Sequence, residues 1–145
     1  MSAIAIDEPL VQQVVLDISS RMKDPNYTQV AVGDFVQSQP HLAQYLSAKL
    51  RSVADGEAVM VAAFHGSLLR ECFRRALGTP ELRVIDFPSL DRVATRVSAE
   101  GASDAPAEGL LANENKALAD YLTSNVDEAE IRESLALVAL ALGSD

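Results

Sequence analysis

Apolar residues recur at intervals of three and four over most of the chain, a spacing that places them on one face of an α-helix. The first such stretch follows Asp7, a residue typical of helix N-caps, and Pro9, which suits a first helical turn. A helix is therefore predicted from there to about Lys23. Ser38 and Pro40 form the same kind of start and predict a further amphipathic helix behind them.

The longest helical pattern covers residues 57–77 and ends at a Gly-Thr-Pro stop signal. Its first half is apolar on every side, which is typical of a helix enclosed by other helices. Ala58, Ala62 and Gly66 form a ridge of small residues along this helix. We expect a neighbouring helix to approach closely at the ridge.

Residues 28–37 carry two patterns at once. The segment begins with a strand-like alternation, and Gly33 and Asp34 suit a two-residue hairpin turn. Val32 and Phe35 also share a helical face, and an isolated hairpin is marginally stable. The sequence therefore predicts a helix here, with a small β-ribbon as the alternative.

Residues 82–87 favour extended backbone, because Val84, Ile85 and Phe87 suit pleated structure and Pro88 restricts the residue before it. We predict an extended connection at this point. A short amphipathic segment follows and reaches about Val97.

Residues 99–109 are small and acidic and have no apolar period, which is typical of a flexible linker. Behind them, residues 113–124 and a stretch that starts near Asp127 carry helical patterns. The predicted organisation is a helical core domain over 1–98, a flexible acidic linker over 99–109 and an acidic C-terminal helical hairpin over 110–145. The predicted fold class is all-α, a bundle of about five to seven helices.

The last predicted helix is unusually apolar. Its main stripe has intervals of four, three and four, the seam spacing of paired helices, and neighbouring leucines widen it. The stripe consists of Ile131, Leu135, Val138 and Leu142. So much apolar surface must be covered, either inside the chain's own monomer or by a partner or second copy, and the sequence leaves both open. We take the four residues as candidate partner-binding residues.

Charge is distributed unevenly along the chain. Residues 1–97 contain 10 Lys and Arg against 11 Asp and Glu, whereas residues 98–145 contain 2 against 10, so the last third holds most of the net charge of −9. A negative field repels phosphate backbones, which disfavours binding to DNA or RNA. The negative charge of the last third favours basic protein partners over nucleic acids.

The sequence also bears on the class and compartment of the protein. The longest apolar runs, 58–64 and 135–142, are far shorter than the roughly 20 residues of a membrane span. Asp7 and Glu8 lie where a signal peptide has basic residues. Cys72 is the single cysteine, so the chain closes no internal disulfide. We expect a cytoplasmic protein.

Catalytic chemistry has one weak candidate. His65 and Cys72 are seven residues apart on one predicted helix, with Glu71 beside the cysteine, which suggests a redox or nucleophilic site. Two helical turns separate them by about 10.8 Å, too far for a direct hydrogen bond. A buried cysteine and a histidine at the edge of the core are the simpler interpretation. No catalytic, cofactor or metal site is predicted, because no phosphate-binding loop or metal-ligand motif occurs.

Three arginines cluster at the end of the 57–77 helix: Arg70, Arg74 and Arg75. They have two interpretations. They stabilise the helix end, with Glu71 paired to Arg75 four residues on. Alternatively they accept a carboxylate-rich segment, either this chain's own acidic C-terminal part or a partner. We take them as further candidate partner-binding residues.

These observations predict a non-enzymatic protein–protein interaction module, such as an adaptor, a regulatory subunit or an assembly protein. It would use its apolar C-terminal helix and acidic surface to bind a partner or to self-associate, with no cofactor. The first alternative is a small acidic chaperone, antitoxin or immunity-type protein that covers a basic surface. The second alternative is a small enzyme that uses His65 and Cys72.

Overall fold

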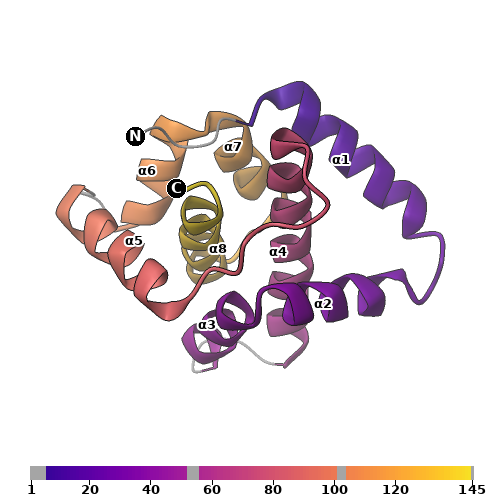
Figure 1. The fold of residues 1–145 in the computed structure, drawn as a ribbon, viewed down its shortest axis with the longest axis horizontal. Helices are drawn as coiled ribbons and strands as arrows, with labels where there is room; N and C mark the ends of the chain where they lie inside the picture. The colour runs from indigo at the N-terminus through magenta and orange to yellow at the C-terminus, as the bar shows by residue number, and fades with distance from the viewer. Residues whose placement is uncertain (1–5, 52–55, 101–103, 145) are drawn as a thin grey trace.

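The computed structural model describes residues 6–51, 56–100 and 104–144, which form eight α-helices and no strand (Figure 1). The helices are α1 (Glu8–Arg21), α2 (Tyr27–Ser38), α3 (Pro40–Leu50), α4 (Gly56–Leu77), α5 (Phe87–Glu100), α6 (Pro106–Glu114), α7 (Lys116–Asn125) and α8 (Ala129–Leu142). The predicted all-α class is confirmed. The predicted count of five to seven helices is too low, because three helices, α6 to α8, stand where a two-helix hairpin was expected.

Helix α8 lies at the centre of the bundle, in contact with α3, α4, α5, α6 and α7 (Figure 1). Every residue from Ser134 to Leu142 is buried. The one hydroxyl in this stretch, that of Ser134, donates to the carbonyl of Glu130 at 2.9 Å, so its burial leaves no polar group unpaired. A helix that is apolar on all sides is stable in water only when other elements surround it, which explains its central position.

The predicted core over 1–98 and the predicted hairpin over 110–145 contribute to one hydrophobic core. Val14, Leu46 and Leu69 from the first part lie in the same buried cluster as Leu118 and Leu135 from the second. Both ends of the predicted linker are helical, since residues 99–100 belong to α5 and residues 106–109 belong to α6. Residues 101–103 of the predicted linker lie outside the described residues.

Helix α6 owes its start to a carboxylate from another helix. The side chain of Glu133 in α8 accepts hydrogen bonds from the backbone N–H groups of Ala107, at 2.7 Å, and Glu108, at 3.0 Å. These groups lie in the first turn of α6, where no backbone partner is available and negative charge is favoured. Arg132 strengthens the same junction through an ion pair with Glu108 at 3.3 Å.

Helix α2 forms where the sequence allowed a helix or a β-ribbon, so the predicted helix is confirmed. Ala31 and Phe35, four residues apart, are its buried residues, and α2 packs against α4. The approach is close at the predicted small-residue ridge, because a Cβ atom added to Gly66 would lie 2.8 Å from Cζ of Phe35. Glycine is therefore needed at this position of α4.

Residues 82–86, which belong to no helix or strand, join α4 to α5. Helix α5 begins at Phe87, so the extended backbone predicted for this residue is wrong, because Pro88 lies in the first helical turn, where a proline is tolerated. The fully buried side chain of Gln39 holds this connection. Its amide Nε2 donates to the carbonyl of Arg83, and its Oε1 accepts from the N–H of Ile85, both at 2.9 Å. The side-chain amide thus satisfies two backbone groups that have no partner in a helix or strand. Ile85 can therefore be buried without leaving its N–H unpaired.

Helices α1 and α2 each pack against α4, and residues 22–26 connect them (Figure 1). The Asp7 carboxylate caps α1, as predicted, by accepting from the N–H of Leu10 at 3.1 Å. Val11, Val14 and Ile18 are the buried residues of α1. This arrangement leaves a pocket between the three helices.

Candidate functional site

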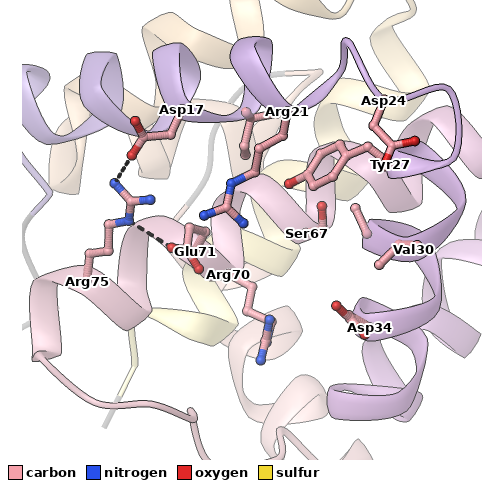
Figure 2. Close-up of a pocket in the computed structure, with 12 residues that line it drawn as sticks. Asp17, Arg21, Asp24, Tyr27, Val30, Asp34, Ser67, Arg70, Glu71 and Arg75 are labelled. Atoms are coloured by element: carbon pink, nitrogen blue, oxygen red, sulfur yellow. Dashed lines mark hydrogen bonds and ion pairs between the residues drawn. The ribbon is translucent and has the colours of Figure 1, made fainter.

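The pocket between α1, α2 and α4 has a volume of about 410 Å³ and is lined mainly by polar side chains (Figure 2). Three arginines and four acidic residues contribute to its wall: Arg21, Arg70, Arg75, Asp17, Asp24, Asp34 and Glu71. Ligand sites are usually concave and contain a few convergent polar groups. The pocket is therefore our candidate functional site.

One side of the pocket is a closed network of ion pairs. Arg75 in α4 donates to Asp17 in α1 and to Glu71 in α4, both at 2.7 Å, and Arg74 pairs with Glu71 at 2.6 Å. Figure 2 shows the two bonds of Arg75. The network fixes α1 on α4 and neutralises both carboxylates.

The ion pairs change the pKa values of the carboxyl groups. The hydrogen bond from Arg75 lowers the pKa of Asp17. Burial by itself raises the pKa of Glu71, but the hydrogen bonds from Arg74 and Arg75 outweigh burial and leave the pKa below its ordinary value. Both groups are therefore ionised at neutral pH.

Four other side chains of the pocket form no hydrogen bond or ion pair with any residue in the described part of the chain: Arg21, Tyr27, Asp34 and Arg70. They come from α1, α2 and α4 and surround one opening (Figure 2). Burial raises the pKa of Tyr27, so its phenol is protonated at neutral pH and can donate a hydrogen bond.

Arg70 is the most unusual of the four. Its Nε atom is buried and has no hydrogen-bond partner. An unpaired buried donor costs about 1–3 kcal/mol, and more when it carries charge, so such groups need an explanation in a folded protein. Figure 2 shows the side chain extending from α4 away from the ion pairs of Arg75.

The predicted arginine cluster is thus divided by the structure. Arg74 and Arg75 are held by Glu71 and Asp17, which agrees with the helix-end interpretation, and neither bonds to a carboxylate of residues 104–144. The spacing explains this result, because Glu71 is three and four residues away on the same helix. Arg70 alone among the three lacks a partner in the described chain.

The predicted apolar stripe lies inside the monomer. Ile131, Leu135, Val138 and Leu142 are at most 6% exposed and face the surrounding helices. Of the two alternatives that the sequence leaves open, the structure has the stripe packed in its own chain. A partner surface at these residues would require α8 to leave the core.

His65 and Cys72 do not form a site with each other. His65 Nδ1 lies 2.7 Å from the hydroxyl oxygen of Tyr121 in α7, and burial lowers the pKa of the imidazole. Cys72 is fully buried, and burial raises the pKa of its thiol to about 12. The nucleophilic thiolate is therefore scarcely populated at neutral pH. Glu71, the neighbouring acid, is engaged by Arg74 and Arg75.

Within the described ranges, no three His, Cys, Asp or Glu side chains gather in a way that suits a metal ion. None of the helices in the same ranges has the length and apolar character of a membrane span. Comparisons of the chain with protein-family models, curated proteins and solved structures give no match.

Sequence reasoning missed Arg21, Tyr27 and Asp34. They belong to two helices and are brought to α4 only by the packing of α1 and α2. One local signal was present, because Asp17 and Arg21 are four residues apart and flank Ile18 on the buried side of α1. That signal places them at the edge of a helix–helix contact.

Proposed function

We propose that this protein is a non-enzymatic protein–protein interaction module that docks a segment of a partner in the pocket between α1, α2 and α4. A docking surface of this kind is what an adaptor, a regulatory subunit or an assembly protein requires. The apolar stripe of α8 is buried, so the proposal uses the pocket in its place.

The observation that carries the proposal is the set of charged side chains in an open pocket that form no ion pair within the described part of the chain. Arg75, Arg74, Asp17 and Glu71 neutralise one another, which leaves Arg21 and Arg70 against Asp24 and Asp34. Separated charges of both signs favour a segment that also carries both signs, because each group then finds an opposite partner.

The experiment that tests docking compares two valines of α2. Val30 lines the pocket and is 55% exposed, whereas Val36 is 44% exposed and lies outside the pocket lining. Both sites accept a large side chain without strain in the core. Val30→Trp narrows the pocket, and Val36→Trp is the matched control.

Immobilised wild type and both variants are incubated with native lysate, and the captured proteins are quantified. A protein retained by wild type and Val36→Trp but lost by ~10-fold or more with Val30→Trp is expected. The same captured set with both variants, or capture of nothing, would contradict docking in the pocket. Equal melting temperatures of the three chains show that the fold is unchanged.

A second candidate function is a small acidic chaperone, antitoxin or immunity-type protein. The observation behind it is that Asp127, Glu128 and Glu130, close together in the sequence, are all exposed where α8 begins. Binding of a basic surface through these residues would weaken steeply at 1 M salt, where the Debye length is about 3 Å. Replacing the three by Asn, Gln and Gln would abolish it, whereas Val30→Trp would not.

The enzyme alternative is tested through Cys72. We expect the native protein to react with a thiol reagent at neutral pH at least ~100-fold more slowly than the urea-unfolded protein, because the thiol is buried. Rapid labelling of the native chain would revive a catalytic role for this cysteine.

A further inference from the structure

Arg70 has unused hydrogen-bonding capacity. A guanidinium carries five N–H donors, and none of those of Arg70 reaches an acceptor in the part of the chain that the structure describes. Arg75 differs, since its Nε and Nη1 already donate to Glu71 and Asp17. Of these two arginines of α4 that line the pocket, Arg70 is the one available to a ligand.

The acidic residues of the pocket do not satisfy Arg70. Asp17 and Glu71 are occupied by Arg75, and Asp24 accepts the N–H of Asn26 at 2.9 Å. Asp34 lines the pocket but forms no bond to Arg70. The described part of the chain therefore supplies no acceptor for Arg70, and a bound ligand can supply one.

The chemistry of the pocket selects the acceptor. A planar guanidinium matches a carboxylate or a phosphate through two parallel N–H···O bonds. Asp24 and Asp34 make the pocket less favourable for a doubly charged phosphate than for a singly charged carboxylate. A carboxylate on a peptide also brings backbone N–H groups, which are suitable donors for Asp34.

From these observations we infer that Arg70 is the recognition residue for an Asp or Glu side chain of the docked partner segment. Arg21 and the Tyr27 hydroxyl line the same opening and add positive potential and a hydrogen-bond donor. The guanidinium turns within the pocket when the carboxylate binds, since its Nε is buried in the free protein. This inference rests on the proposed docking function of the pocket.

The test uses the ¹⁵N-labelled full chain and NMR spectra of its arginine Nε–H groups and backbone amides. N-acetyl-glutamate α-amide is the probe, N-acetyl-glutamine α-amide is its neutral match, and inorganic phosphate is the third ligand. Arg70→Gln removes the charge, whereas Arg70→Lys keeps the charge but cannot form the two parallel hydrogen bonds of a guanidinium. Arg51→Gln is the control, because Arg51 is exposed and does not line the pocket.

The glutamate compound is expected to shift the Nε–H signal of Arg70, which is identified by its absence in Arg70→Gln, in a saturable way. Affinity is expected to fall by ~10-fold or more for the glutamine compound and for Arg70→Gln, to fall less for Arg70→Lys, and to stay unchanged in Arg51→Gln. Hydrogen exchange at Nε of Arg70 is expected to slow when the glutamate compound binds.

Other results overturn the inference and are distinguishable from failure of docking. Equal shifts with the glutamate and glutamine compounds, or unchanged binding in Arg70→Gln, would show that Arg70 does not select a carboxylate. Stronger binding of phosphate would reassign the ligand, and no shift with any probe would reject the site. The comparison of Val30→Trp with Val36→Trp judges docking itself, whichever result is obtained here.

Discussion

Helix α8 and the pocket between α1, α2 and α4 are held in place by different forces. Helix α8 is surrounded by five helices, and its position follows from apolar side chains that must leave water. The wall of the pocket is stabilised by charge, since Asp17 in α1 forms an ion pair with Arg75 in α4. Burial therefore decides where the helices of this bundle lie, and the ion pairs decide which charged side chains remain available to a partner.

The largest effect is expected from a charge placed in α8. Leu135 is fully buried, so Leu135→Asp forces a carboxylate into the core or unfolds the chain. We expect a loss of more than ~4 kcal/mol in the free energy of unfolding, measured by urea denaturation. Leu16→Asp is the control, because Leu16 is 65% exposed, and it should change stability by no more than ~0.5 kcal/mol.

Light scattering over a dilution series completes this test. Because the stripe of α8 is packed within the monomer, we expect the wild type to remain a single chain at every concentration. A dimer that Leu135→Asp dissociates without loss of helix content would restore the stripe as a surface for self-association.

A polar contact in the interior should have the next largest effect. Gln39→Ala leaves the carbonyl of Arg83 and the N–H of Ile85 without their side-chain partner. We expect a loss of ~2–4 kcal/mol, measured by thermal or urea denaturation. Gln37→Ala alters an exposed glutamine of α2 and should cost nothing measurable. Equal stability of the two variants would mean that water replaces the amide.

Replacing each of two glycines by alanine tests the close approach of α2 and α4. Gly66→Ala brings a Cβ atom to within 2.8 Å of the buried ring of Phe35, and we expect a loss of ~1–3 kcal/mol. Gly33→Ala places a Cβ atom in α2 with nothing within 4 Å and should stabilise the helix by ~0.5–1 kcal/mol. Urea denaturation measures the change in the free energy of unfolding for each variant. Changes of opposite sign would support the close packing at Gly66, whereas changes of the same sign would contradict it.

The smallest effect is expected at the ion pairs. Glu71→Gln removes the charge that Arg74 and Arg75 share, and we expect a loss of ~1 kcal/mol at pH 7. Glu81→Gln changes an exposed glutamate and serves as the control. A loss as large as that of Leu135→Asp would break the distinction between the two regions.

The effect of Glu71→Gln should also depend on pH. The pKa of Glu71 is lower in the folded chain than its ordinary value of 4.5, so its carboxylate stabilises the fold above that value. The stabilisation is lost as the pH falls through the folded pKa. The difference in melting temperature between wild type and Glu71→Gln should therefore shrink below pH 4.5, whereas a constant difference would show that charge is not its cause.

Local signals in the sequence account for much of the bundle. The N-cap at Asp7, the small residue at Gly66 and the break between α4 and α5 each depend on groups close by or on a regular period. The burial of α8 follows from the width of its apolar surface, although the sequence does not say whether its own chain or another one covers it.

Contacts between distant segments were not predictable in the same way. Helix α6 has little apolar period, and its first turn is held by Glu133, about 25 residues further on. The pocket depends on residues from 17 to 75, and an exposed Arg21 or Asp34 looks like any other surface charge in the sequence. Only the packing of three helices shows which charges are paired.

The central position of α8 has a consequence for protein synthesis. A ribosome makes α3 to α7, the helices that pack against α8, before α8 itself, so the nascent chain exposes the apolar faces of those helices while α8 is still absent. Exposed apolar faces of this kind attract chaperones and promote aggregation. The burial of Leu46, Leu69 and Leu118 in one cluster with α8 is completed only after residues 129–142 have left the exit tunnel.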